Sequence, residues 1–223
     1  MMLNETYFER ARYNMVHNQL IPNGITNENL IDAFLKLPRH NFILSKWRDV
    51  SYTDAALPVC NMVNSSRFMM PALVTAKMYQ SSNITLNSKV LDFYSNTCYS
   101  SFIISHIAKK VVAVDTNKDL LEIGIQQLSS NTVNNILFQL FQDFYHQVSN
   151  QIFDLIIVNG IMNDIPEFLK NVLVENGQIL LIQKKEFVAK VIKYVKYKEY
   201  LFKDDDYVVD IDERFSIREN FMK

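Results

Sequence analysis

Glycine is scarce in this chain, with only four among 223 residues. Cysteine is scarcer still, because Cys60 and Cys98 are the only two and they lie far apart in the sequence. Their spacing offers neither the CxxC pairs of a zinc site nor the dense framework of a disulfide-stabilised domain. The four histidines are scattered, without a metal-ligand spacing such as HExxH. We therefore expect no metal site.

Long apolar runs and an excess of one charge are also missing. No apolar run approaches the roughly 18 residues that a membrane span needs, and the opening MMLNETYFERAR lacks the apolar centre of a signal peptide. Lys and Arg number 23 against 24 Asp and Glu, and no basic block is longer than a pair. We expect a cytoplasmic protein with neither a membrane nor a nucleic acid as its partner.

A strand, turn, helix and second strand organise the middle of the chain. The runs Ser88–Phe93 and Val111–Asp115 are mainly apolar, which is typical of strands buried on both faces of a parallel sheet. Between them, a polar turn precedes apolar positions at nearly helical spacing: Phe102, Ile103, Ile107 and Ala108. In such βαβ units a ligand lies beyond the carboxyl ends of the strands. Asp92 and Asp115 would stand there, at about the spacing expected when an acid meets a ribose hydroxyl.

The turn of this unit, Tyr94 to Cys98, contains no glycine. A loop that cradles a nucleoside or a phosphate usually has glycines, because glycine adopts positive φ and lets the backbone approach a ligand. Asn96 tolerates the left-handed conformation, whereas Tyr94 and Cys98 do so poorly. The residues of the turn leave two interpretations open, a nucleotide-binding turn and a purely structural crossover.

Helices and strands continue to alternate after this unit. We expect a helix over Lys118–Leu128, strands over Asn135–Phe141 and Phe153–Gly160, a helix over Ile165–Val174 and a strand over Gln178–Gln183. This order predicts an α/β fold whose open sheet is wound on both faces. The tail alternates as antiparallel edge strands do, and Asp204–Asp206 resembles a turn between them.

Two helices are expected near the start of the chain. The first covers Asn4–Leu20 and is broken by Pro22 and Gly24. The second begins near Asn27, whose side chain can cap it, and Pro38 ends it.

The stretch from Arg39 to Met70 lacks periodicity, as functional loops often do. For its apolar cluster Phe68 to Met70, packing against the core is favoured over contact with a ligand. Pro71 is expected to open a third helix. We expect one domain, 1–223, in which 1–80 is a helical and loop region, 81–185 a Rossmann-like core and 186–223 the edge strands.

Several motifs, in order along most of the chain, resemble those of a known family. PRHNF matches a PRxxF motif, SYTDAALPV matches A-Y-x-D…L-P-I, and PALVTAKM matches P-x-x-x-A-x-M. KVLDFYSNTCY stands where the family has V-L-E-I-G-x-G-x-G-Y, and VVAVD and FDLIIVNG stand where it has its second and fourth strands. On these residues the chain resembles the protein-L-isoaspartate O-methyltransferase family.

The resemblance implies a Rossmann-like class I methyltransferase fold, with a doubly wound and mostly parallel sheet, an antiparallel C-terminal edge and N-terminal helices. It implies S-adenosylmethionine as the cofactor, a protein or peptide with an isoaspartyl-like carboxylate as the substrate, and protein repair as the function. It leaves the oligomeric state open. By position, Asp115 would bind the ribose hydroxyls, Asp92 would line the methionine side, Asp143 would approach the adenine and Tyr99 would follow the glycine loop.

The chain departs from the family pattern in two places. Tyr94, Asn96 and Cys98 replace the three loop glycines and would contact the cofactor instead of them. Met69 replaces the Ser that supports methyl transfer, and we assign Met69 and Asp54 to the catalytic side. Two functions stay open: an active methyltransferase with an altered loop, which we favour, and a non-catalytic binding or scaffold member of the same fold.

Overall fold

A seven-stranded sheet forms the centre of the protein. The computed structural model describes residues 5–60, 67–131, 133–148, 151–211 and 213–217. The strand order is β5-β4-β3-β6-β7-β8-β9. The strands are β3 (Lys89–Phe93), β4 (Lys110–Asp115), β5 (Ile136–Leu140), β6 (Phe153–Ile161), β7 (Leu173–Lys185), β8 (Val188–Tyr197) and β9 (Tyr200–Val209). All pairs from β5 to β7 are parallel, and β8 and β9 add an antiparallel edge. The predicted fold class is confirmed.

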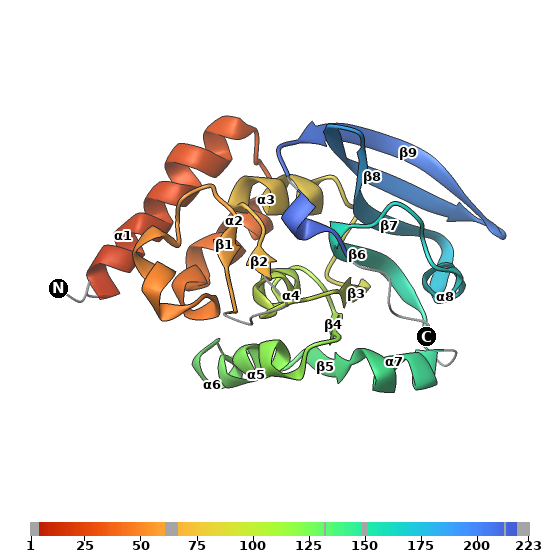
Figure 1. The fold of residues 1–223 in the computed structure, drawn as a ribbon, viewed down its shortest axis with the longest axis horizontal. Coiled ribbons are helices and arrows are strands. Elements are labelled where there is room, and N and C mark those ends of the chain that lie inside the picture. The colour runs from red at the N-terminus through yellow and green to blue at the C-terminus, as the bar shows by residue number, and fades with distance from the viewer. Residues whose placement is uncertain (1–4, 61–66, 132, 149–150, 212, 218–223) are drawn as a thin grey trace.

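The central strands of the sheet are buried on both faces. Successive residues of β3 and β4 enter opposite cores, so that Val90 and Val111 pack on one face while Leu91 and Val112 pack on the other. Figure 1 shows the sheet crossing the molecule from β9 at the upper right to β5 at the bottom. Because neither face meets water, these strands read as continuous apolar runs in the sequence.

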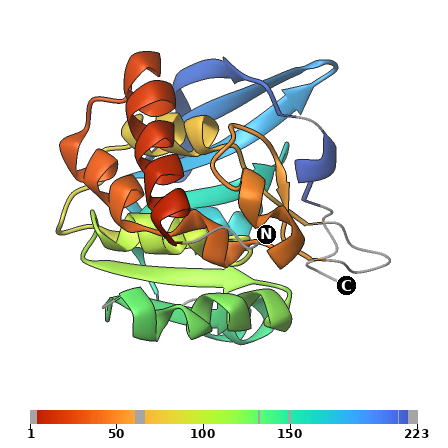
Figure 2. The ribbon, with the colours of Figure 1, turned by 90° about the vertical axis from the view of Figure 1, so that its left-hand side faces the viewer.

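Helices cover both faces. They are α1 (Glu5–Met15), α2 (Glu28–Lys36), α3 (Ala72–Gln80), α4 (Tyr99–Ser105), α5 (Lys118–Gln126), α6 (Leu128–Asn131), α7 (Phe141–Gln147) and α8 (Glu167–Asn171). Buried residues of α1 to α5 join one core, and those of α7 and α8 join the other. In Figure 2 the N-terminal helices, red to orange, lie in front of the sheet.

The N-terminal helices follow their sequence signals closely. Asn4 lies outside the described residues, and α1 continues as a π-helix over Val16–Leu20. Gly24 then turns the chain with φ 91°. The predicted cap of α2 is confirmed, since the Asn27 side chain accepts a hydrogen bond from the Leu30 N–H at 3.1 Å.

The stretch before α3 is not a bare loop. It holds two 3₁₀ turns, Arg39–Phe42 and Ser45–Val50, and a short antiparallel pair, β1 (Leu57–Pro58) with β2 (Phe68–Met69). Helix α3 starts one residue later than expected, because Pro71 is its N-cap. These short elements are too brief to leave a periodic signal in the sequence.

Several predicted boundaries are wrong. Ile107 and Ala108 are buried beyond the end of α4. Phe141 begins α7 instead of ending β5, which places Asp143 in the first turn of a helix. Helix α8 ends at Asn171, and β7 takes over from Leu173 with a bulge in its pairing with β6. Asn176 adopts φ 61° within this bulge and does not break the element.

The acidic run Asp204–Asp206 is not a turn. It lies inside β9, and the hairpin turns instead near Lys198, which has φ 54°. Lysines on the neighbouring strand neutralise the run, since Lys193 pairs with Asp204 at 2.8 Å and Lys190 with Asp206 at 3.2 Å. Opposite charges across a strand pair stabilise an element that acidic residues alone would disfavour.

Within the part of the chain that the structure describes, no helix combines the length and the apolar character needed to cross a membrane.

Candidate functional site

The turn after β3 keeps a left-handed backbone at three alternate positions without a glycine. The φ angles of Tyr94, Asn96 and Cys98 are 62°, 61° and 66°. A non-glycine residue held in this region costs of the order of 1 to 3 kcal/mol, and such strain persists only where the surroundings enforce it. Tyr94 and Cys98 were predicted to tolerate this conformation poorly, and the fold overrides that preference.

Contacts with the neighbouring elements enforce this turn. The Ser95 N–H donates to the Val114 carbonyl at 3.0 Å, and the Cys98 N–H donates to the Ser95 carbonyl at 2.8 Å. Cys98 is fully buried against Gly124 of α5. A Cβ on Gly124 would lie 2.8 Å from the Cys98 Cβ, so the missing side chain of the helix makes room for the side chain of the loop.

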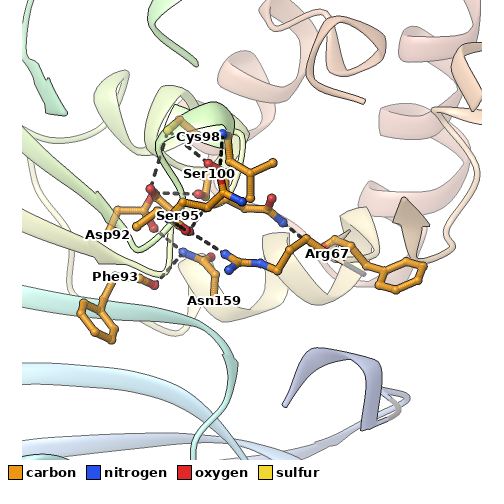
Figure 3. Close-up of polar contacts among 12 residues, drawn as sticks. Arg67, Asp92, Phe93, Ser95, Cys98, Ser100 and Asn159 are labelled. Atoms are coloured by element: carbon orange, nitrogen blue, oxygen red, sulfur yellow. Dashed lines mark hydrogen bonds and ion pairs between the residues drawn. The ribbon is translucent and has the colours of Figure 1, made fainter. Parts of the chain in front are cut away.

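Asp92 is fully buried at the carboxyl end of β3 and accepts hydrogen bonds from three side chains. Ser100 donates at 2.7 Å, Asn159 donates at 2.5 Å, and Ser101 also donates. Figure 3 shows Asp92, Ser100 and Asn159 gathered around the turn. Burial raises the pKa of Asp92 to about 6, although the three donors oppose the shift.

Asp115, at the end of β4, is also closed off from solvent, with 1% of its surface exposed. Its Oδ2 accepts from the Asn96 N–H at 2.7 Å and from Arg67 Nη2 at 2.6 Å. Its Oδ1 accepts from the Asn117 N–H at 3.0 Å. The Arg67 guanidinium also lies 3.6 Å from the centre of the Tyr94 ring. In Figure 3, Arg67 extends to the turn from the side opposite Asp92.

A small cavity of about 30 Å³ lies beside the turn. Its walls include Met69 and Met70 of the β2 segment, and Thr97, Tyr99 and Asn159. Among the described residues, no hydrogen-bond partner meets the buried hydroxyls of Thr97 and Tyr99. Pockets for ligands of nucleoside size have roughly 300 Å³ or more. The backbone of the turn therefore suits a nucleoside cofactor, but this cavity between the described side chains is by itself smaller than such a ligand.

The structure brings most of the predicted site residues together. Asp92, Tyr94, Asn96, Cys98 and Tyr99 belong to one turn and its flanks, and Asp115 and Met69 lie against it.

Two predicted residues stand apart from the cavity. Asp54 accepts from the Leu73 N–H at 3.0 Å and so caps the start of α3. Asp143 is exposed in the first turn of α7 and is not part of the cavity wall. Their assigned roles remain predictions.

Arg67, Asn159 and the serines at 100 and 101 were not among the predicted site residues. Asn159 had a signal in the sequence, because it lies near the carboxyl end of a buried strand, at the same sheet edge as Asp92. Arg67 had none, since it comes from an aperiodic stretch that only the tertiary fold brings to Asp115.

Comparison with known proteins decides the family. The family model for protein-L-isoaspartate(D-aspartate) O-methyltransferase matches residues 11–210. The chain belongs to this family. The protein-L-isoaspartate O-methyltransferase of Dictyoglomus thermophilum is 30% identical over 158 residues, covering 71% of this chain and 70% of the relative. Protein-L-isoaspartate O-methyltransferase 1 of Pelobacter propionicus is 27% identical over 192 residues, covering 85% and 87%.

Solved structures agree with the fold. A protein-L-isoaspartate O-methyltransferase superposes with a TM-score of 0.74 at 17% identity, covering 92% of this chain and 67% of the other. A protein of the same family from Plasmodium falciparum, in complex with S-adenosyl-L-homocysteine, gives 0.70 at 16%, covering 88% and 93%. The predicted resemblance and the predicted class, an S-adenosylmethionine-dependent methyltransferase family, are confirmed.

Proposed function

We propose that this chain is an S-adenosylmethionine-dependent O-methyltransferase that methylates an isoaspartyl-like carboxylate of a damaged protein or peptide in the cytoplasm. The observation that carries the proposal is the turn after β3. It keeps three left-handed positions at Tyr94, Asn96 and Cys98 although none of them is glycine. Strain of this kind is typical of functional sites, and a purely structural crossover has no need of it.

The residues around the turn take distinct roles in this proposal. Asp115 receives the ribose hydroxyls, Asp143 approaches the adenine, and Asp92 supports the methionine side through Ser100 and Asn159, which it already binds. Tyr94, Asn96, Cys98 and Tyr99 form the wall that meets the cofactor. S-adenosylmethionine would supply the methyl group from its sulfonium, and its sulfur would leave as the neutral thioether of S-adenosylhomocysteine.

The acceptor side needs alignment more than proton transfer. A carboxylate is ionised near neutral pH, so catalysis consists mainly of holding it in line and keeping water out. Asp54 caps α3 and thereby fixes the segment that carries Met69 and Met70. Met69, which is 7% exposed, gives this side an apolar wall.

A second function is favoured by a different observation. Arg67 and two backbone N–H groups already surround Asp115, and the cavity beside it holds about 30 Å³. We would expect this filled site in a binding or scaffold protein that no longer binds the cofactor.

Two measurements separate these functions. Isothermal titration with S-adenosylhomocysteine tests the cofactor site. Transfer of labelled methyl from S-adenosylmethionine to an isoaspartyl peptide tests the reaction, with the same peptide carrying normal aspartate as the control. We expect binding, and labelling of the isoaspartyl peptide alone. Absence of both at millimolar cofactor would reject the enzyme and leave the scaffold.

A further inference from the structure

Arg67 forms an ion pair with Asp115, the residue that binds the cofactor ribose in the proposed function. Its guanidinium lies 2.6 Å from Asp115 Oδ2 and 3.6 Å from the Tyr94 ring centre. Its side chain is 10% exposed and that of Asp115 is fully buried, so no ligand hydroxyl can reach Asp115 while the guanidinium stays there. Because little water screens these two charges, the electrostatic attraction between them is strong.

We infer that Arg67 is an internal competitor of the cofactor ribose for Asp115, and that it sets the affinity of this site for S-adenosylmethionine. This inference rests on the proposed function. It makes Arg67 an affinity-determining residue, and it assigns Tyr94 a task, because the Tyr94 ring holds the guanidinium in place.

The surroundings of the pair allow an exchange of partners. Asp115 keeps the Asn96 and Asn117 N–H groups when the arginine leaves, so its charge retains two donors. The Arg67 carbonyl accepts from the Val59 N–H at 3.0 Å, which anchors the backbone while the side chain moves. Since the apparent affinity of a ligand falls with the fraction of competent molecules, a pair that is closed nine times in ten weakens binding about tenfold.

The test compares ligand binding by Arg67→Met with binding by the parent protein. Methionine keeps an unbranched side chain but has no charged donor, so it cannot pair with Asp115. Isothermal titration uses S-adenosylhomocysteine, adenosine and 2′,3′-dideoxyadenosine. Arg48→Met, at an exposed arginine, is the matched control. Arg67→Lys, which keeps the charge but not the planar fork, serves as the second variant if Arg67→Met melts too low to titrate.

We expect Arg67→Met to bind S-adenosylhomocysteine and adenosine at least tenfold more tightly than the parent, and Arg48→Met to bind as the parent does. The affinity for 2′,3′-dideoxyadenosine should not increase, because this ligand lacks the 2′ and 3′ hydroxyls that would bind Asp115. Arg67→Lys should lie between the two proteins.

Three results would overturn the inference. If the parent binds S-adenosylhomocysteine and Arg67→Met binds it equally or less well, Arg67 is not a competitor, while the proposed function stands. If the affinity for dideoxyadenosine increases as much as the affinity for adenosine, the substitution acts by making space and not by freeing Asp115. If neither protein binds any of the ligands, the inference falls together with the proposed function.

Discussion

At the scale of single residues, the site is built on two acids in opposite surroundings. Asp92 is buried among neutral donors, Ser100, Ser101 and Asn159, and its pKa is raised to about 6 because burial outweighs them. Asp115 is buried beside a cation and two backbone N–H groups. An ionised carboxylate at this sheet edge is therefore destabilising at Asp92, whereas at Asp115 it is part of an ion pair.

Asp92 should make the protein less stable as the pH rises. Its pKa lies at about 6 in the folded state against 3.8 in the unfolded chain, so the folded state binds more protons between these values and stability falls as pH rises through them. The contribution is of the order of 3 kcal/mol. Urea unfolding of the parent and Asp92→Asn at pH 4 and pH 7 measures it. The difference between the two proteins should grow with pH in favour of the variant, and a constant difference would contradict the assignment.

Met69 is predicted to occupy the position at which the family has a serine, and a substitution there tests this register on the acceptor side. Met69→Ser should leave methylation of an isoaspartyl peptide unchanged or raise it, because the hydroxyl can meet the carboxylate. It should lower the free energy of unfolding by about 1 to 3 kcal/mol through lost burial. Activity is measured per folded molecule, with Met70→Ser as the neighbouring control. A clear loss of activity would mean that Met69 itself serves the substrate.

At the scale of elements, the turn after β3 and helix α5 depend on each other. The turn has a side chain at Cys98 where its family has glycine, and α5 has Gly124 where a side chain would collide with it. A loop that departs from its family pattern is thus accommodated by the element packed against it.

Gly124→Ala should destabilise the protein by about 1 to 3 kcal/mol, as overpacking does. Its Cβ would lie 2.8 Å from the Cys98 Cβ and 3.1 Å from Phe138 Cε1. In a Cys98→Gly background the first clash is gone, so the cost of the same substitution should fall by at least half. Denaturant unfolding of the four proteins gives the coupling free energy. Additive effects would show that the turn and the helix do not share this space.

At the scale of the whole molecule, the N-terminal region is part of the same core as the sheet. One hydrophobic cluster extends from Phe8 in α1 to Ile211 beyond β9. Arg39 adds a polar connection, because this fully buried side chain donates to the Ser51 carbonyl at 2.9 Å and to the Met70 carbonyl at 2.7 Å. Burial lowers the pKa of Arg39, and Tyr99 and Asp54 oppose that shift.

Arg39→Met should lower the free energy of unfolding by about 2 to 4 kcal/mol, since it leaves two buried carbonyls without a donor. If residues 1–223 are one domain, the loss should appear in a single transition. Fluorescence of Trp47, the only tryptophan, reports on the N-terminal region, and far-ultraviolet circular dichroism reports on the sheet. The two curves should coincide in parent and variant. Separate midpoints would divide the chain into two units.

Features of this protein that repeat or follow local rules are predictable from its amino-acid order. Buried parallel strands need unbroken apolar runs, which is why β3, β4 and β6 are legible in the sequence. The Asn27 cap and the order of the motifs are local signals as well. Since parallel strands end at one edge, Asp92 and Asp115 were predicted to meet there.

The other features of the fold and the site depend on contacts between residues far apart in the chain. Local sequence signals therefore do not predict them. The left-handed turn runs against the preferences of Tyr94 and Cys98, and contacts from other elements hold it, among them Gly124 and the Val114 carbonyl. Asp204–Asp206 became a strand because lysines lie across from it. Arg67 and Asp115 are 48 positions apart in the sequence. Their side chains come together only in the folded protein, so no local periodicity predicts the pair.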